Sequence, residues 1–158
     1  MKTAKIIASG LGTGYAPVAP GTAGSVLGIT FFYGLNLLLN HLGVGKTGVS
    51  VLNLFAVIIL LLWGVYAIKK VHRIWEHDSP KIVIDEIVGV GIAAVAIPLK
   101  WQYYLYALIL FRIFDIVKPF GIKKLDNLKS DWSVMLDDVL AGVYAAAVLQ
   151  LVMYLEIL

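Results

Sequence analysis

Five carboxylates of this 158-residue chain lie in or beside apolar segments, where a charge is costly. They form two adjacent pairs and one single residue: Asp85 with Glu86, Asp137 with Asp138, and Asp115. A charged side chain at the centre of a membrane helix costs roughly 2.5–3.5 kcal/mol on insertion scales, so such acids face the bundle interior and mark functional sites. For any single acid an interhelical ion pair is an equally good interpretation, but five acids together favour a functional cluster.

Two basic residues accompany these acids. Arg112 lies three residues before Asp115, which puts both side chains on one face of a helix. That helix should end near Lys118, because Pro119 follows it. Arginine and lysine bind phosphate directly, and Mg²⁺ takes carboxylate oxygens and commonly bridges to a phosphate. The pattern therefore predicts a site for Mg²⁺ and a phosphate group. The expected metal ligands are Asp85, Glu86, Asp115, Asp137 and Asp138.

Helical spacing indicates where two of the acids point. Gly89 follows Asp85 by four residues, and Gly142 follows Asp138 by four residues. Small residues mark the faces at which membrane helices pack together. Asp85 and Asp138 should therefore point into the bundle rather than toward lipid.

A glycine-rich stretch, "GLGTGYAPVAPGTAGS" at residues 10–25, leads into the first apolar segment. Gly24 and Gly28 form a G-x-x-x-G face suited to close helix packing. We expect a helix to begin near Gly21, and the free backbone N–H groups of a helix start suit an anion. The hydroxyl groups of Thr22 and Ser25 can add hydrogen-bond donors. Thr22 can instead cap the helix. We therefore expect phosphate contacts here, added to those of Arg112 and Lys118.

The composition is that of an integral membrane protein. The chain is 60% hydrophobic and 15% charged, with a mean hydropathy of +0.88. It has no cysteine, which excludes disulfides, thiol nucleophiles and thiolate metal sites. We expect one domain over residues 1–158, an all-α, small polytopic membrane helical bundle. The modest net charge of +3 indicates no nucleic-acid partner, no protein partner is evident, and the oligomeric state stays open.

About five segments can cross a bilayer. They are Gly24–Leu39, Val51–Ile68, Pro80–Leu99, Trp101–Val117 and Val134–Leu155. The first two carry no charge and approach the ~20 residues that a spanning helix needs. The last three carry charges, and one of them can instead be re-entrant or interfacial.

The distribution of charge predicts the orientation. With the N-terminus in the cytoplasm, only Lys46 and Lys100 of the 13 basic residues lie outside, as the positive-inside rule requires. Lys129 counts among those inside. The acids apart from Glu156, and the glycine-rich stretch, fall on the same side. We therefore expect a multi-pass protein of the bacterial inner (cytoplasmic) membrane whose active site faces the cytoplasm.

Four motifs, in matching order and spacing, resemble bacterial phosphatidylglycerophosphatase A. They are "GTGYAPVAPGTAGS" near the start, "KIVIDEIVGV" at 81–90, "FRIFDIVKPFGIKKLD" at 111–126 and "MLDDVLAGV" at 135–143. One element departs from the family: its Asp-His pair before the Asp-Glu motif is reversed here, as His77-Asp78. We assign that pair no catalytic role; Asp78 can cap the following helix, and His72 and His77 are expected to be ordinary interfacial residues.

The resemblance implies a Mg²⁺-dependent hydrolase that removes the terminal phosphate of phosphatidylglycerophosphate, giving phosphatidylglycerol in phospholipid biosynthesis. Its substrate is a phospholipid in the membrane. We expect Asp85, Glu86, Asp115, Asp138, Arg112 and Lys118 to be catalytic. Water activated by a metal, with a carboxylate as general base, and an aspartyl-phosphate intermediate both remain open.

The alternative is a small transporter or a proton- or cation-conducting protein, which also places acids inside helices. Many transporters contain internal repeats with short, broken segments, and the two halves of this sequence show no convincing repeat. The polar residues of a conducting pathway would also reach across the bilayer, whereas these gather at one face.

Overall fold

The computed structural model describes residues 1–77, 79–119, 121–126, 128 and 130–155, and over these residues the fold is all-α. Asp78, Lys129 and Glu156, for which the sequence suggested a cap or a side of the membrane, lie outside the described residues. The helices are α1 (Lys2–Ala8), the 3₁₀ helix η1 (Gly10–Tyr15), α2 (Pro20–His41), α3 (Lys46–Val71), α4 (Ile84–Ala93), α5 (Trp101–Val117), α6 (Ile122–Asp126) and α7 (Ser133–Tyr154).

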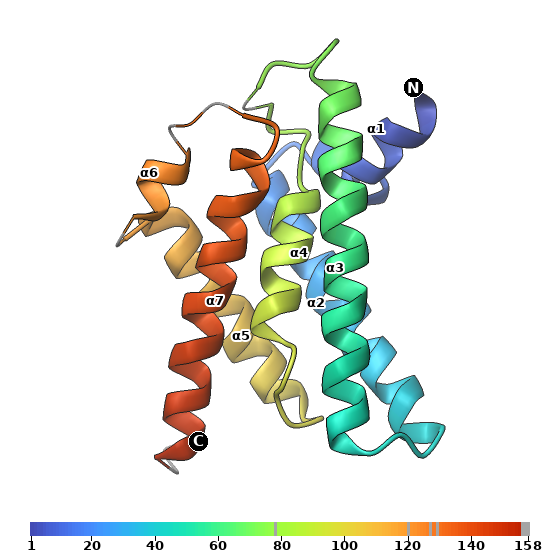
Figure 1. Cartoon of the computed structure of the whole chain (residues 1–158), viewed down its shortest axis with the longest axis vertical. Helices are drawn as coiled ribbons and strands as arrows, with labels where there is room; N and C mark the ends of the chain where they lie inside the picture. The colour runs from blue at the N-terminus through green and yellow to red at the C-terminus, as the bar shows by residue number, and fades with distance from the viewer. Residues whose placement is uncertain (78, 120, 127, 129, 156–158) are drawn as a thin grey trace.

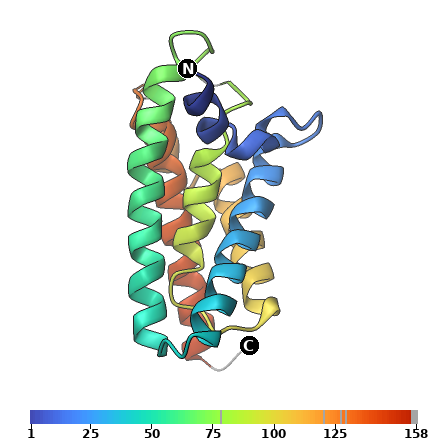
Figure 2. The same cartoon turned by 90° about the vertical axis from the view of Figure 1, so that its right-hand side faces the viewer.

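Five of these helices form an up-and-down bundle, in which each helix runs antiparallel to the one before it: α2, α3, α4, α5 and α7 (Figures 1 and 2). The N-terminus lies at one end of the bundle, and the chain finishes α7 at the other (Figure 1). Within the described part of the chain, three helices are long and apolar enough to span a membrane: α2, α3 and α7. The 17 residues of α5 extend about 25 Å at 1.5 Å per residue.

The third expected segment, Pro80–Leu99, differs from a continuous spanning helix. Only Ile84–Ala93 is helical, and these 10 residues extend about 15 Å, half the thickness of a hydrocarbon core. This helix, α4, packs against α2, α3, α5 and α7 and is therefore enclosed by protein. Non-helical backbone is tolerated at membrane depth when protein satisfies its polar groups. Gln150 Nε2 donates to the carbonyl of Ala96 at 2.7 Å, directly after α4.

Glycines let the neighbouring helices approach α4 closely, as the sequence predicted. A Cβ added at Gly24 would lie 2.7 Å from Val83, and one at Gly28 would lie 2.7 Å from Val90. On the other side of α4, a Cβ at Gly142 would overlap the carbonyl oxygen of Gly89. The α2–α4 and α4–α7 contacts therefore depend on the absence of side chains at these positions.

The outer surface of the bundle is apolar. On α3, exposed large side chains recur at the spacing of one helix face: Val51, Phe55, Ile58, Leu62 and Tyr66. A soluble protein rarely exposes a contiguous apolar surface of this kind, whereas a bilayer accommodates it. The pattern agrees with the length and composition of α3 as a membrane-spanning helix.

Candidate active site

A cavity of about 200 Å³ opens at the end of the bundle that carries the N-terminus. The residues before α4, the end of α5 and the start of α7 enclose it. Its charged and ionisable lining consists of His77, Asp85, Glu86, Asp115, Lys118, Asp137 and Asp138. We call it the acidic cavity. It brings together every acid that the sequence singled out, from three separate helices.

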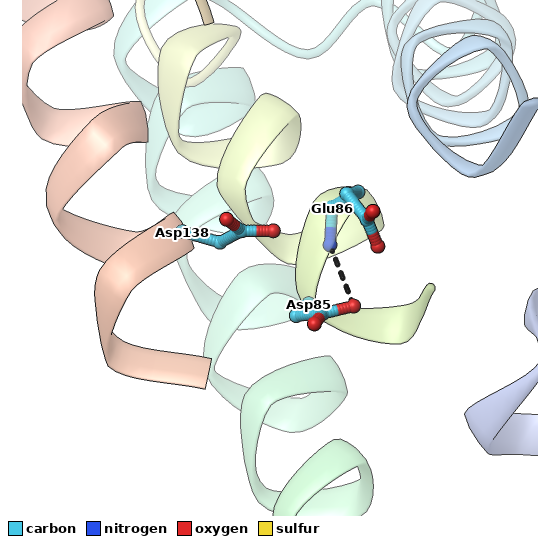
Figure 3. A group of neighbouring side chains, drawn as sticks. All are labelled: Asp85, Glu86 and Asp138. Carbon is cyan, nitrogen blue, oxygen red and sulfur yellow. Dashed lines mark hydrogen bonds between the residues drawn. The ribbon is translucent and has the colours of Figure 1, made fainter. Parts of the chain in front are cut away.

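Three of these acids form the acid cluster: Asp85, Glu86 and Asp138. Each offers a carboxylate oxygen, and these oxygens all lie within 4.8 Å of one another. Figure 3 shows Asp138 reaching from α7 toward the first turn of α4, where Asp85 and Glu86 lie side by side. The backbone N–H of Glu86 donates to Asp85 Oδ1 at 3.1 Å. The partial positive charge of the α4 start favours both acids, but three carboxylates this close together repel one another unless a cation or a bound proton offsets their charge.

The acid cluster also has an open acceptor. Glu86 Oε2 is buried and has no hydrogen-bond partner among the described residues. A buried acceptor without a partner is destabilising by about 1–3 kcal/mol, more for a charged group, unless a ligand or ion satisfies it. The acid cluster is therefore a candidate metal site on two grounds, its crowding of anions and this open oxygen.

Arg112 connects α5 to the acid cluster. Its Nη1 donates to Asp115 Oδ2 at 2.7 Å and lies 3.9 Å from Glu86 Oε1. The Arg112–Asp115 pair confirms that residues three apart share one face of this helix. Asp115 is thus an ion-paired acid at the edge of the acid cluster.

Lys118 links the end of α5 to α7. The helix ends at Val117, as Pro119 predicted, and Lys118 adopts the left-handed conformation with φ +47°. Its Nζ lies 2.8 Å from Asp137 Oδ2, and both side chains line the acidic cavity. Non-glycine residues rarely adopt this backbone conformation. Here it turns the chain at Lys118, whose ammonium group pairs with Asp137. The five expected metal ligands therefore divide into a cluster of three and two ion-paired acids.

The start of α2 lies against the acid cluster. A Cβ added at Gly21 would overlap Glu86 Oε1 and come within 3.3 Å of Arg112 Nη1. The helix begins at Pro20 with Ala19 at the N-cap position, so the alternative that Thr22 caps the helix is wrong. Proline suits the first position because its fixed φ fits the helix and its missing N–H is not needed there. Thr22 is exposed on the first turn of the helix.

Ser25 lies one turn further along α2 and is fully buried. Its hydroxyl donates to the carbonyl of Gly21 at 2.8 Å. A serine hydroxyl has one hydrogen to donate, so the Ser25 donor serves the helix backbone in this structure. Its phosphate contact stays a prediction.

Sequence reasoning gave His77 no role at the site, but its side chain lines the acidic cavity. Its ring stacks on that of His72, with centroids 4.8 Å apart and planes 23° from parallel. His72 Nδ1 lies 2.6 Å from Asp131 Oδ1, in the segment that leads into α7. Two signals were available in the sequence: His77 belongs to the reversed Asp-His element, and it precedes Asp85 by only eight residues.

Comparison with known proteins identifies the family of this chain. The family model described as phosphatidylglycerophosphatase A matches residues 6–153, nearly the whole chain. This chain belongs to the phosphatidylglycerophosphatase A family. The resemblance that the four motifs suggested is therefore confirmed, and the chain is a lipid phosphatase of that family. No solved structure shows a significant match.

Three relatives of this phosphatidylglycerophosphatase A family member carry two different names. A Bacteroides thetaiotaomicron protein named "Putative phosphatidylinositol-3-phosphatase" is 41% identical over 143 residues, covering 89% of this chain and 87% of the relative. Proteins named phosphatidylglycerophosphatase A come from Haemophilus influenzae, 38% identical over 94% of this chain and 88% of the relative, and from Escherichia coli, 32% identical over 91% and 80%.

The donor set of this family member fits a hard divalent cation. The acid cluster offers only carboxylate oxygens, the ligands that Mg²⁺ takes, and neither cysteine nor histidine belongs to it. Glu86 Oε2 supplies an acceptor with no other partner among the described residues. The acid cluster can therefore hold a metal, and Mg²⁺ suits these donors better than Zn²⁺, which favours nitrogen and sulfur.

Proposed function

We propose that this protein hydrolyses the terminal phosphate of phosphatidylglycerophosphate, giving phosphatidylglycerol and inorganic phosphate, with Mg²⁺ as cofactor. The observation that carries the proposal is the buried acid cluster beside Arg112 at one end of a bundle with three candidate spanning helices. Two of the three relatives described above bear the name of this activity. A phosphomonoester needs cations around its oxygens, and this end of the bundle provides them.

Asp85, Glu86 and Asp138 would hold the cation, which when bound supplies Lewis-acid stabilisation of charge on the phosphoryl oxygens. Arg112 and Lys118 bind the phosphate and stabilise its equatorial oxygens as the bond to the glycerol oxygen breaks. The backbone N–H groups at the start of α2, beside Gly21, add donors of the kind that favour an anion.

The ion-paired acids are the candidates for proton transfer. Asp115 or Asp137 accepts the proton of a water that attacks phosphorus in line, and the departing glycerol oxygen takes a proton from solvent water. The other possible route is attack on phosphorus by an aspartate itself, followed by hydrolysis of the phosphoaspartate. Trapping of a phosphorylated protein after rapid acid quench distinguishes the two routes.

The test of the function is phosphate release by purified protein in mixed micelles. We expect turnover of phosphatidylglycerophosphate with Mg²⁺, none after treatment with a chelator, and recovery when Mg²⁺ is added back. Release that is unaffected by the chelator would contradict the metal assignment. Absence of release under every condition, together with proton or cation flux in liposomes, would favour the transporter interpretation instead.

A second substrate is favoured by one specific observation. Of the three relatives, the one with the highest identity to this chain, 41%, is named for a phosphatidylinositol phosphate. Both candidates are phosphomonoesters on a hydroxylated lipid head group, so the same charged residues serve either. Measuring kcat/KM for phosphatidylglycerophosphate and phosphatidylinositol 3-phosphate in parallel decides between them. A tenfold or larger preference for the inositol lipid would replace the primary proposal.

We also propose that the acidic cavity faces the cytoplasm in the inner membrane. The support is the charge count in the sequence, by which only Lys46 and Lys100 of the 13 basic residues are expected on the outer side of the membrane. Because the chain has no cysteine, single cysteines report orientation without background labelling. A membrane-impermeant thiol reagent added to intact spheroplasts should label Lys46→Cys, at the start of α3. It should label Lys69→Cys, near the end of that helix, only after lysis.

A further inference from the structure

A second cavity, of about 320 Å³, lies at the end of the bundle opposite the acid cluster. It is bounded by the end of α2, the start of α3, the segment between α4 and α5, and the last turn of α7. Among its polar lining residues are Asn36, Lys46 and Tyr104. We call it the amide cavity. Nothing in the proposed phosphatase reaction uses it.

Asn36 is a buried amide with an unused acceptor. The residue is 3% exposed, and its Nδ2 donates to the hydroxyl oxygen of Tyr104. Its Oδ1 is buried and has no hydrogen-bond partner among the described residues. An amide oxygen in this state favours a ligand that brings a hydroxyl or another N–H or O–H donor into the cavity.

The start of α3 supplies groups of the opposite kind. Lys46 begins this 26-residue helix, and no side chain caps it. The first backbone hydrogen bond into the helix is donated by the N–H of Val49, so the three preceding N–H groups have no acceptor within the helix. Lys46 and Val49 both line the amide cavity. Of the three residues that carry these N–H groups, Lys46 is among the described lining residues, and its cationic side chain and its own uncapped N–H both favour an anionic oxygen.

These two sets of groups define the ligand. We propose that the amide cavity binds a hydroxylated phosphate ester, with a hydroxyl donating to Asn36 Oδ1 and a phosphate oxygen near Lys46. An ammonium group is disfavoured, because no acid is among the described residues that line the cavity and Lys46 repels a second cation. The ligand is either the polyol head group of an anionic phospholipid or a free polyol phosphate. This inference does not depend on the proposed phosphatase activity.

The experiment is native mass spectrometry of the purified protein with defined lipids, in the presence of a chelator. Phosphatidylglycerol carries both a phosphate and hydroxyls, phosphatidylcholine lacks the hydroxyls, and phosphatidylethanolamine has an ammonium instead. We expect wild type to retain phosphatidylglycerol about tenfold more than either other lipid, the ratio that one good charged hydrogen bond produces. Lys46→Ala and Asn36→Leu should each remove most of that preference.

Lys100→Ala is the matched control, since Lys100 is an exposed lysine expected at the same end and is absent from the cavity lining. It should keep the preference. Lys46 is exposed, so its variant keeps the test valid even if Asn36→Leu fails to fold. No preference in wild type, or a preference that survives both variants, would overturn the proposal. So would a preference lost in Asp138→Asn alone, because the lipid would then occupy the acidic cavity.

Soluble glycerol 3-phosphate separates the two sources of the ligand. If it displaces phosphatidylglycerol from wild type but not from Lys46→Ala, the amide cavity accepts the free polyol phosphate. If it displaces nothing while the lipid preference depends on Lys46, the site recognises a lipid head group. Either result supports the shared chemistry.

Discussion

The acidic cavity and the amide cavity lie in one helical bundle but hold polar groups of different kinds. At one end three carboxylates crowd within 4.8 Å, and two more acids pair with Arg112 and Lys118. At the other end neutral amides bond to a phenol and to backbone carbonyls, and a single lysine lies at the opening.

The difference follows from the cost of burial. A neutral amide needs only hydrogen-bond partners, and Asn36 finds one in Tyr104. A buried carboxylate also needs compensating charge, and among the described residues the Arg112 and Lys118 ion pairs and the candidate metal site all lie at the acidic end. Losing one member of the charged site therefore leaves an uncompensated charge, whereas a substitution in the amide cavity leaves only an unpaired neutral group. The following predictions test that contrast, from the largest expected effect to the smallest.

Asp138→Asn should have the largest effect on phosphatase activity. It keeps the size of the side chain but removes one charge from the acid cluster, and we expect kcat/KM to fall at least about 100-fold, the upper end of losses for residues that only support metal ligands. Glu76→Gln is the matched control, since Glu76 is an exposed acid near the same cavity. Equal activity of the two variants would contradict the assignment of the acid cluster to the active site.

Gly142→Ala tests whether the acid cluster depends on the close approach of α4 and α7. The added Cβ overlaps the carbonyl oxygen of Gly89, so the helices have to separate, and overpacking of this kind costs about 1–3 kcal/mol. We expect a lower unfolding temperature in detergent together with reduced activity. Gly34→Ala is the control, because nothing lies within 4 Å of its Cβ position. If both variants unfold alike, the packing argument is wrong.

Lys118→Gln tests the ion pair with Asp137. The substitution removes a cation from the acidic cavity and leaves a buried carboxylate without it. We expect KM for the lipid phosphate to rise about tenfold, as for the loss of one charged hydrogen bond. Steady-state kinetics on mixed micelles measure this. A change in kcat with no change in KM would assign Lys118 to the chemical step instead of binding.

Thr22→Val and Ser25→Ala compare two hydroxyls on one helix. Thr22 is exposed on the first turn of α2, while the Ser25 hydroxyl donates to the carbonyl of Gly21. If the helix start binds phosphate, Thr22→Val should raise KM about threefold, the effect of one neutral hydrogen bond. Ser25→Ala should raise it less. The reverse order would show that Ser25 turns toward the substrate.

Substitutions in the amide cavity should affect activity least. Lys46→Ala and Asn36→Leu are expected to keep kcat/KM within about twofold, because both residues lie at the opposite end of the bundle from the acid cluster. The same assay as for Asp138→Asn measures this. A large loss of kcat/KM in Lys46→Ala would show that phosphatase activity depends on both ends of the bundle.

Much of the acidic site was predictable from local sequence. The spacing of Arg112 and Asp115 predicted a shared helix face, and their contact at 2.7 Å confirms it. Pro119 predicted the end of α5. Gly89 and Gly142 predicted a packing face, and each lies against the other's helix. These predictions succeeded because each rests on helical periodicity or on the steric effect of one residue.

Other features were not predictable from local spacing. Hydropathy treated Pro80–Leu99 as one segment, whereas only its centre is helical. Beyond α4, the side chains of Asn53 and Gln150 donate to the carbonyls of Val95 and Ala96. The alternative of a Thr22 cap was wrong because Pro20 starts the helix earlier. His77 received no role because its place in the cavity depends on the path of a loop.

The sequence by itself determined that the chain is apolar, that its acids lie mostly toward one face, and which family its motifs belong to. Only the tertiary structure decided that Asp85, Glu86 and Asp138 form one cluster while Asp115 and Asp137 pair with cations. It also brought Gly21 against Glu86 and formed the amide cavity. The reason is physical: periodicity fixes the direction of a side chain on its own helix, but which helices meet depends on packing across the whole bundle.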